Sequence, residues 1–585
     1  MSDATASART EGDLQVTQHS SESYDYVIVG GGSAGCVLAN RLSARAGVRV
    51  ALIEAGADTP PGAVPPEIED SYPMPVFCGE RFIWPTLQAR ATRRAPLKVY
   101  EQGRVMGGGS SVNVQSANRG LPRDYDEWAE MGAVGWSWRE VLPYFRRLER
   151  DLDFPDSPLH GRDGPMPIRR IPAARWPAFG HAFADGLRAF GLPELADQNG
   201  EFGDGLFASA FSNEAECRAT SASAYLDAAT RQRPNLHIFS STRVRALRFA
   251  THGGKPRVVG VAACDAQGRA LQFAARETLV CAGALQSPAL LLRAGIGDPD
   301  ALCGAGVAPR LALPGVGRNL QDHPSLTFCH YLPRALRTPL AYRRASMVAA
   351  RLSSGIAQDA SDLYLSSATR AAWHALGARL GLFFLWCNRP RSRGSVTLRS
   401  PDPDMMPEVH LNLLDAPEDL ARLVSGVRQL AQIVAASTLG GERRDFFPAS
   451  FSPRVKRLSR YTRSNDWITR VLGAVLDAPA PVRRWVLDRF VARGVYVADL
   501  ARDDAALERF IESHVFGVWH ASGTCRMGAA EDPMAVTDTT GRVHRCDGLR
   551  VVDASLMPRL PSANTNIPTL MMAEKIAAHM LGEAA

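Results

Sequence analysis

Residues 24–54 read YDYVIVGGGSAGCVLANRLSARAGVRVALIE and combine four features in a fixed order. An apolar, β-branched run over 24–29 is followed by a glycine-rich turn, a helical segment and a second apolar run that ends at Glu54. A glycine turn between an apolar strand and a helix is typical of a nucleotide-binding βαβ unit. The segment therefore predicts the start of an α/β, Rossmann-like domain.

The glycines of this turn have the spacing Gly30-x-Gly32-x-x-Gly35. In such a loop the first glycine permits the tight turn, the second lets the backbone approach a pyrophosphate, and the third lets the helix pack closely on the strand. Glu54 lies 19 residues beyond Gly35, where a carboxylate can bind ribose hydroxyls. The acid argues against a bound 2′-phosphate, but the loop alone does not distinguish FAD from NAD.

The composition is that of a globular chain large enough for more than one folding unit. With 585 residues, 45% of them hydrophobic and 22% charged, we expect two interwoven domains. We interpret the formal charge of +7 as spread over the 67 basic residues without a dense basic run, which argues against a nucleic-acid groove. Small molecules are the expected partners.

Cysteine usage and the N-terminus indicate the compartment. The ten cysteines form no C-x-x-C pair and are too sparse for a disulfide scaffold or a zinc cluster, so we predict no metal site and a reducing environment. The first 23 residues lack the apolar core of a secretory signal, and no later apolar run approaches the roughly 18 to 20 residues of a membrane span. We expect a disordered leader over 1–23 and a cytoplasmic protein without a membrane partner. The sequence leaves the oligomeric state open.

Six motifs show which family the chain resembles. They are DYVIVGGGSAGCVLANRLS (25–43), GRVMGGGSSVN (103–113), CAGALQSPALLLRAGIG (281–297), GVGRNLQDHP (315–324), HASGTCRMG (520–528) and LRVVDASLMPRLPSANTNIPT (549–569). Together they resemble the glucose-methanol-choline (GMC) oxidoreductases along nearly the whole chain after residue 23. The resemblance implies that the cofactor is FAD.

The resemblance also implies the architecture. We expect an α/β fold, α+β overall, in which a substrate-binding domain built on an antiparallel sheet is inserted into the Rossmann-like FAD-binding domain. A strand candidate at 277–282, far from the first βαβ unit, agrees with a nucleotide domain assembled from separated pieces. The expected FAD-binding pieces are 24–170, 235–322 and 515–585, and the expected substrate-binding pieces are 171–234 and 323–514.

By the same resemblance, the FAD pyrophosphate is expected on the glycine loop, the ribose on Glu54 and the adenine near the backbone of Val244. The motif at 103–113 would wrap the pyrophosphate and isoalloxazine. Asp553 and Ala554 would close the pyrophosphate end, and Asn566 and Ile567 would lie under the flavin pyrimidine. Val112 stands where some relatives carry a flavin-linked histidine, so FAD is expected to be noncovalent. The implied cofactor-binding residues are Gly30, Gly32, Ser33, Ala34, Gly35, Glu54, Ala55, Trp84, Arg104, Gly108, Asn113, Val114, Val244, Ala282, Asp553, Ala554, Asn566 and Ile567.

Alcohol oxidation needs a base at the flavin face that takes the hydroxyl proton while the carbinol carbon gives up hydride. Histidine suits this role because its ordinary pKa of about 6.5 leaves it largely neutral near pH 7. The resemblance assigns the base to His520 and the hydrogen bond to the substrate oxygen to Asn564. Trp519 is expected to form a wall for a flat ring, with an ordinary core aromatic as the alternative. His323 is expected to be structural.

The segment Asn564–Pro568 precedes a helix that we predict from Thr569 to about Leu581. The N–H groups at the start of such a helix would stabilise the negative charge of a reduced flavin. The alternative is that Asn-x-Asn-x-Pro only caps a surface helix.

The resemblance implies oxidation of primary aromatic or furanyl alcohols to aldehydes, and of hydrated aldehydes to acids, with molecular oxygen reduced to hydrogen peroxide. One alternative is a choline-dehydrogenase-like enzyme that passes electrons to a quinone or another acceptor. A second is a redox-neutral lyase that acts on cyanohydrins and uses the histidine for acid–base chemistry. The motifs do not separate oxidase from dehydrogenase.

Overall fold

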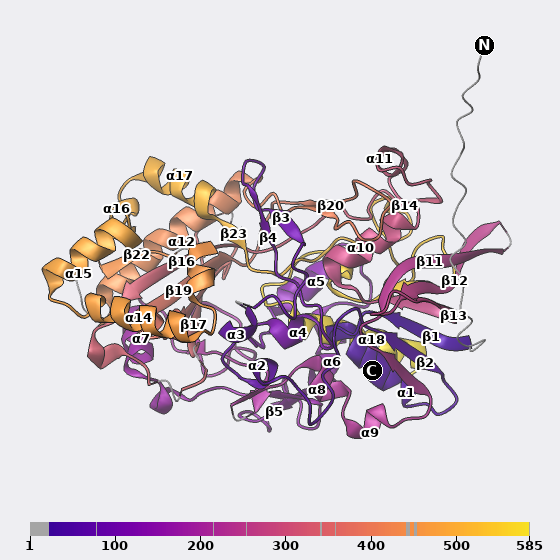
Figure 1. Ribbon diagram of the computed structural model, residues 1–585, viewed down its shortest axis with the longest axis horizontal. Helices are drawn as coiled ribbons and strands as arrows, with labels where there is room; N and C mark the ends of the chain where they lie inside the picture. The colour runs from indigo at the N-terminus through magenta and orange to yellow at the C-terminus, as the bar shows by residue number, and fades with distance from the viewer. Residues whose placement is uncertain are drawn as a thin grey trace, which may run out of the picture.

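The computed structural model describes residues 23–77, 79–214, 216–252, 254–339, 342–344, 346–356, 358–439, 445–449 and 453–583. The predicted leader, 1–23, lies outside these ranges except for Ser23. Two seven-stranded sheets occupy opposite halves of an elongated molecule (Figure 1). They correspond to the two kinds of sheet that the sequence predicts.

The first sheet contains the predicted βαβ unit. Its order is β10 (Leu236–Phe239), β2 (Val50–Ile53), β1 (Ser23–Val29), β13 (Ala270–Val280), β12 (Lys255–Cys264) and β11 (Arg243–His252), with β24 (Leu549–Val551) also on β13. The pairs among β10, β2, β1, β13 and β24 are parallel, and β11 and β12 are antiparallel. Helices α1 (Ser33–Ser43) and α18 (Asn566–Leu581) pack against each other beside these strands (Figure 1). The Rossmann-like prediction is confirmed.

Strand β13 is longer than the predicted strand at 277–282. It begins at Ala270, and its first half alternates exposed and buried residues where it pairs with the hairpin strand β12. The continuous apolar run that made the strand visible in the sequence is only its last part, which is buried between β1 and β24.

The second sheet is antiparallel throughout. Its order is β22 (Phe446–Pro448), β16 (Pro324–Tyr331), β19 (Leu380–Cys387), β18 (Leu363–Ala368), β17 (Val348–Leu352) and β7 (Gly205–Ala208), with β23 (Phe516–Gly517) also on β16. Every pair in it runs antiparallel. The predicted antiparallel sheet is confirmed.

Helices α7 (Ala178–Ala189) and α12 (Pro417–Ala436) cover one face of this sheet. In β19, side chains alternate between the two faces. Phe383 packs on Phe183 of α7 with a ring-centroid distance of 5.0 Å. Leu382, Phe384 and Trp386 point to the other face and line a cavity. The apolar run GLFFLWC therefore serves both the core and the site.

The limits of the two domains stay a prediction. Within 171–234, β7 joins the antiparallel sheet, whereas α8 (Ser221–Tyr225) and α9 (Ala228–Arg231) lie against α1. There Asn40 Nδ2 donates to the carbonyl of Tyr225 at 2.8 Å and to Thr230 Oγ1 at 3.0 Å. This piece of chain contacts both sheets.

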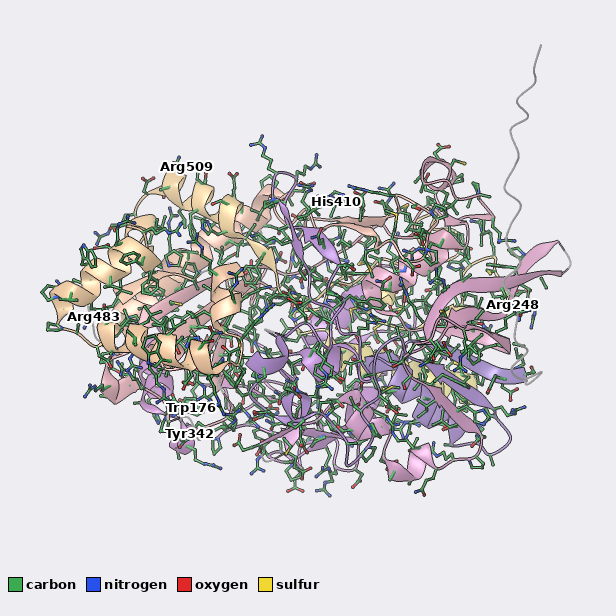
Figure 2. The ribbon with its side chains drawn as sticks, viewed as in Figure 1. Trp176, Arg248, Tyr342, His410, Arg483 and Arg509 are labelled. Carbon is green, nitrogen blue, oxygen red and sulfur yellow. The ribbon has the colours of Figure 1, made fainter. Side chains whose placement is uncertain are left out.

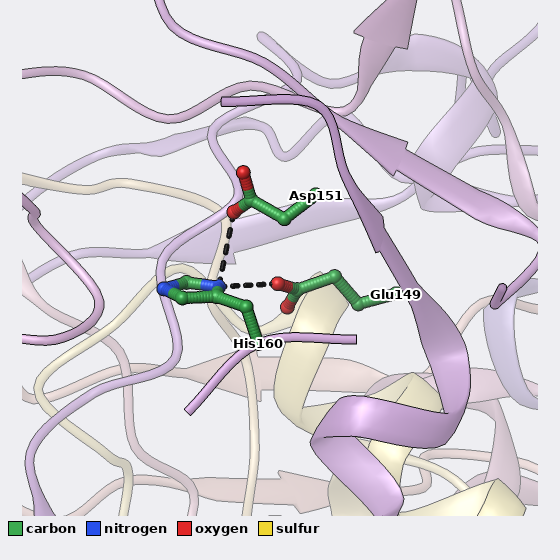
Figure 3. Close-up of side chains that lie close together, drawn as sticks. All are labelled: Glu149, Asp151 and His160. Atoms are coloured by element: carbon green, nitrogen blue, oxygen red, sulfur yellow. Dashed lines mark hydrogen bonds and ion pairs between the residues drawn. The ribbon is translucent and has the colours of Figure 1, made fainter. Parts of the chain in front are cut away.

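A buried ionic network connects residues 119–197. His160 lies at its centre, with Nδ1 at 2.5 Å from Glu149 Oε1 and 3.0 Å from Asp151 Oδ2, and Nε2 at 2.7 Å from Asp197 Oδ2 (Figure 3 shows the first two contacts). Two arginines complete the network: Arg119 binds Glu149, and Arg170 binds Asp151 and Asp197. Three carboxylates thus meet two guanidinium groups and one imidazole.

This arrangement argues against a metal at Glu149, Asp151 and His160, although the three residues lie close enough to ligate one. Burial opposes the charged imidazole, but hydrogen bonds to Asp151, Asp197 and Glu149 outweigh it and raise the pKa of His160 to about 10. A protonated imidazole has no lone pair for a metal. With His160 charged, the network has three charges of each sign.

The pKa of His160 generates a stability prediction. Because the folded-state pKa of about 10 exceeds the ordinary value, the imidazole stabilises the fold fully below about pH 6.5, and this contribution declines until the pH passes 10. We expect His160→Gln to lower the free energy of unfolding by about 3 kcal/mol near pH 6. Urea unfolding between pH 6 and 10 should show a smaller difference from wild type as the pH rises.

The matched control is His181→Gln, which changes an exposed histidine on α7. It should leave the unfolding curve unchanged over the whole range. A constant difference between His160→Gln and wild type at every pH would contradict the assigned protonation state.

Candidate active site

A cavity of about 430 Å³ brings together residues from both large sheets. The glycine loop and Glu54 line it on one side, and β19 and the segment at 518–521 line it on another. Eighteen of the twenty-one predicted site residues line this cavity; only Gly35, Arg104 and Ile567 do not. The predicted residues are therefore neighbours in space, and their roles stay predictions.

The glycine loop has the geometry that its spacing predicts. Gly30 has a φ of +105°, and a Cβ there would lie 2.5 Å from the carbonyl oxygen of Cys281. A Cβ at Gly35 would lie 1.9 Å from the carbonyl oxygen of Gly30, so any side chain would separate α1 from β1. Gly32 faces the cavity, and α1 begins at the next residue. A phosphate can therefore approach the backbone at the start of the helix.

Glu54 is held at the end of β2 by backbone groups. Its Oε2 accepts the N–H of Gly31 at 2.8 Å, and its Oε1 accepts the N–H of Gly56 at 2.7 Å. Burial raises the pKa of Glu54 to about 7, and these hydrogen bonds limit the rise. Each oxygen keeps a second lone pair for a ribose hydroxyl.

Arg104 lies at the edge of the predicted adenine region. Its guanidinium carbon is 4.8 Å from the ring centroid of Trp84, and Arg243 lies at 5.3 Å from the same ring. Trp84 lines the cavity, whereas Arg104 does not line it and is connected to it through this cation–π contact. A role for Arg104 in binding FAD stays a prediction.

Helix α18 begins at Asn566, three residues before the predicted start at Thr569. The prediction was wrong because it placed Pro568 ahead of the helix, whereas proline is tolerated in a first turn, where its missing N–H has no partner to lose. Ser33 Oγ at the start of α1 donates to Asn566 Oδ1 at 2.7 Å. The N-termini of α1 and α18 thus meet at the cavity.

Two amide atoms at this end lack partners within the part of the chain described. They are Asn566 Nδ2 and Asn564 Oδ1, and both are buried. A buried polar atom without a partner costs about 1 to 3 kcal/mol. Together with the glycine loop, these atoms fit a planar group that has polar edges, such as the isoalloxazine of FAD.

His520 follows β23 and is fixed by its backbone. Its N–H donates to Asp322 Oδ1 at 2.9 Å, and the same oxygen accepts the N–H of His323 at 2.8 Å. The other oxygen of Asp322 accepts the hydroxyl of Tyr100 at 2.6 Å. Trp519, just before the histidine, has a φ of +63°, an uncommon conformation for a bulky residue that turns the chain toward the cavity.

The side chain of His520 touches one residue with each nitrogen. Its Nδ1 is 2.8 Å from His323 Nδ1, and its Nε2 is 2.9 Å from Asn564 Nδ2. His323 Nε2 is 3.2 Å from the carbonyl oxygen of Pro561. A carbonyl only accepts, so His323 Nε2 must carry a hydrogen.

The protonation states follow from this chain of contacts. Burial lowers the pKa of His323 to about 3, so the ring is neutral and its Nδ1 can only accept. His520 must then donate from Nδ1. Burial, assisted by His323, also lowers the pKa of His520 well below its usual value. The neutral His520 therefore presents a bare Nε2 to Asn564.

This geometry is that of a general base. The lone pair of His520 Nε2 points at a neutral amide that can donate to an alcohol oxygen at the same place. The sequence analysis gave His323 a structural role and overlooked Asp322 and Tyr100. Asp322 and His323 could have been identified from the sequence, because both lie within the family motif at 315–324.

Comparison with known proteins identifies the family of this chain. Family models described as GMC oxidoreductase match residues 24–325 and 390–573. The chain is a GMC oxidoreductase. Its cofactor is accordingly FAD, and it is an enzyme that oxidises alcohols.

Individual relatives span the whole chain. A 5-(hydroxymethyl)furfural oxidase from a Methylovorus species is 44% identical, covering 96% of this chain and 99% of the relative. An oxygen-dependent choline dehydrogenase from Photobacterium profundum is 30% identical, covering 96% and 93%. The solved structure of pyridoxine 4-oxidase from Mesorbium loti has a TM-score of 0.77 at 27% identity, covering 96% and 100%. All three are named as oxidoreductases.

Two tryptophans lie beside His520 in this GMC oxidoreductase. The ring of Trp386 on β19 stands at 79° to that of His520, with centroids 6.5 Å apart, and it stacks on Tyr364 at 4.4 Å. Trp519 lines the cavity, and its Nε1 donates to Glu101 at 2.9 Å. The sequence analysis named Trp519 and overlooked Trp386, which strand alternation in the run at 381–387 could have identified.

We expect His323→Ala to slow flavin reduction by the alcohol about 10²-fold, because His520 loses the acceptor that fixes its tautomer. His323→Asn offers an amide oxygen near the position of Nδ1 and should recover part of the rate. Anaerobic stopped-flow absorbance measures both. FAD content and the substrate concentration at half-saturation should change little.

Equal rates in His323→Ala and wild type would contradict the assigned role. A loss of bound FAD in both variants, without recovery by asparagine, would show that His323 only supports the fold.

Proposed function

We propose that this enzyme oxidises primary furanyl, benzylic and allylic alcohols, including 5-hydroxymethylfurfural, with molecular oxygen as the acceptor and hydrogen peroxide as the product. The observation that carries the proposal is the pair formed by His520 Nε2 and Asn564 Nδ2 on the cavity that holds the glycine loop. The 44% identity to a 5-(hydroxymethyl)furfural oxidase supports the substrate class.

Asn564 and His520 have separate roles toward the alcohol. Asn564 Nδ2 donates to the alcohol oxygen, and the bare Nε2 of His520 takes the hydroxyl proton. FAD, when bound, accepts the hydride from the carbinol carbon. Neither of the two chain groups is charged before the reaction, so binding a neutral alcohol costs little desolvation.

Protonated His520 then carries a charge that its surroundings disfavour. The partnerless Oδ1 of Asn564 is available to accept the new N–H if the amide turns. The positive charge beside the cofactor favours reduction of oxygen, which develops negative charge. Transfer of this proton to the reduced oxygen, as hydrogen peroxide forms, restores the neutral base.

The cavity wall fits a flat ring. Leu382, Phe384 and Trp386 form an apolar strip from β19, and Trp519 adds a second aromatic surface near the base. An aromatic ring bound between such surfaces would present its hydroxymethyl group to His520. For FAD itself, Val112 lines the cavity and has no nucleophile, which supports noncovalent binding.

The same base can act on a hydrated aldehyde, because a geminal diol presents a hydroxyl on the carbon that gives up hydride. Two buried guanidinium groups, Arg344 and Arg370, also line the cavity. The Nε and Nη1 of Arg370 have no hydrogen-bond partner among the described residues. A cationic lining favours products that carry a carboxylate.

The first test is anaerobic reduction of the flavin by a panel of alcohols, followed by its absorbance at about 450 nm. Wild-type enzyme should bleach with 5-hydroxymethylfurfural and benzylic alcohols. His520→Ala should bleach about 10² to 10⁴ times more slowly, because it lacks the base. Bleaching at the wild-type rate would refute the assignment of His520, and no bleaching of wild type by any alcohol would favour the lyase alternative.

A second prediction concerns the products. Incubation with 5-hydroxymethylfurfural under air should give carboxylic acids as well as the dialdehyde, because the hydrated aldehyde re-enters the same site. Chromatography of the mixture measures this. Accumulation of the dialdehyde alone would contradict oxidation beyond the first step.

The electron acceptor has a separate test. Relatives named oxygen-dependent choline dehydrogenase, and glucose dehydrogenase that uses FAD and quinone, are 30% and 31% identical to this chain. We expect oxygen uptake with stoichiometric peroxide. Turnover only with a quinone or dye would assign the enzyme to the dehydrogenases.

A further inference from the structure

The formal charge of the chain is concentrated in one segment. Residues 453–495 contain 10 basic and 3 acidic residues, which leaves 57 of each sign in the rest of the chain. The net charge of +7 therefore belongs entirely to 43 residues. The sequence analysis noted that the basic residues form no dense run, but it did not notice that their excess over acidic residues is confined to this segment.

This cationic segment is mostly helical. It consists of α13 (Pro453–Leu458), α14 (Arg463–Leu476), α15 (Ala480–Val486) and the π-helical turn η5 (Leu487–Val491). Helices α14 and α15 lie at the end of the molecule away from the nucleotide-binding sheet (Figure 1). Arg483 marks this end in the view with side chains, where Arg248 marks the opposite one (Figure 2).

The same segment carries most of the exposed large apolar side chains. Among the described residues, all the exposed tyrosine, tryptophan and phenylalanine side chains lie within residues 453–495. Trp467, Trp485 and Phe490 are 68%, 63% and 61% exposed. The full exposed set of the segment is Val455, Tyr461, Trp467, Ile468, Val471, Leu472, Val482, Trp485, Phe490, Val491 and Val495. Apolar clusters of this kind mark interaction surfaces.

Helix α14 shows that the exposure is organised. Its buried residues, Thr469, Gly473 and Leu476, face the rest of the chain. The exposed Trp467, Ile468, Val471 and Leu472 fall at positions i, i+1, i+4 and i+5, which form one outward face. The helix is therefore apolar on a side that nothing in the described chain covers.

The segment that carries this apolar face also carries exposed arginines. Arg454, Arg457, Arg463, Arg489 and Arg493 are exposed. The acidic residues of the segment are engaged: Asp466 binds Arg470, and Asp477 binds Arg337 and Arg379 from outside the segment. Three cations are paired outside it, Lys456 with Glu101, Arg460 with Glu80 and Arg483 with Asp445. The exposed field around the tryptophans is positive.

We propose that residues 453–495 bind the surface of a membrane that contains anionic phospholipids. Tryptophan and phenylalanine side chains enter the boundary between headgroups and acyl chains, and arginines bind the lipid phosphates. A second copy of the chain would bring an equal positive charge to the contact, which disfavours self-association. The proposed contact is with the bilayer surface. No helix among the described residues has the length and apolarity to cross a bilayer.

The segment also borders the active-site cavity. Lys456 on α13 binds Glu101, and Glu101 accepts the indole N–H of the cavity residue Trp519. Attachment through α14 and α15 would hold this side of the cavity near the bilayer. The inference does not depend on which alcohol the enzyme oxidises.

Vesicle flotation of the full-length, FAD-loaded protein tests the proposal. The probes are phosphatidylcholine vesicles with and without about one third phosphatidylglycerol. We expect binding to the anionic vesicles only, and about fivefold weaker partitioning for each arginine changed among Arg457, Arg463 and Arg493. The triple variant Trp467→Ser, Trp485→Ser, Phe490→Ser should lose binding at least tenfold.

Matched controls use exposed residues outside the segment. Val134→Ser removes an exposed apolar side chain, and Arg139→Glu with Arg318→Glu changes two exposed arginines. These controls should bind as wild type does, and turnover of a soluble alcohol should be unchanged in every variant, which shows that each one folds.

Failure of wild type to float with anionic vesicles at low salt would overturn the proposal. So would wild-type binding by the triple serine variant. Dimers that dissociate on the same substitutions, without vesicle binding, would assign the surface to a second copy and would equally overturn it.

Discussion

The hydrogen bond between His323 Nδ1 and His520 Nδ1 decides which nitrogen of the proposed base faces the cavity. His323 must accept in this hydrogen bond, because its other nitrogen, Nε2, donates to the backbone carbonyl of Pro561, which can only accept. His323 therefore carries its hydrogen on Nε2, and His520 carries its hydrogen on Nδ1. The Nε2 of His520 is left unprotonated. Burial keeps both rings neutral, since the pKa of each is held below its ordinary value. The fold thereby sets a protonation state through contacts remote from the reacting atoms.

The two sheets supply different parts of this arrangement. The parallel sheet fixes the glycine loop and Glu54, and brings the N-termini of α1 and α18 together through Ser33 and Asn566. The antiparallel sheet fixes His520: β16 begins directly after Asp322 and His323, and β23 pairs with β16 just before His520. Asp322 joins the two backbones through a single carboxylate. The expected FAD site and the proposed base are therefore positioned by separate layers that meet at one cavity.

The parts that sequence could predict are those in which local pattern determines structure. The Gly30–Gly35 spacing and the apolar strands specified the βαβ unit, because a side chain at either end of the loop would collide with backbone. The resemblance located His520 and Asn564. The tautomer could not be predicted, because it depends on Pro561, a residue more than 200 positions from His323. Trp386 and the early start of α18 were missed where apolar runs and prolines allow two local structures. The excess of basic residues over 453–495 is visible in the sequence. Only the structure shows that Trp467 and Trp485 of the same segment are exposed, which makes it a candidate binding surface.

A crystal structure of the FAD-loaded enzyme with a non-reactive alcohol analogue tests the central claim most directly. The account predicts that the hydroxyl oxygen lies within hydrogen-bond distance, about 2.6 to 3.2 Å, of both His520 Nε2 and Asn564 Nδ2. It also predicts that His520 Nδ1 stays bonded to His323 Nδ1. A hydroxyl bound to other groups, or a His520 ring turned so that Nδ1 faces the alcohol, would contradict it.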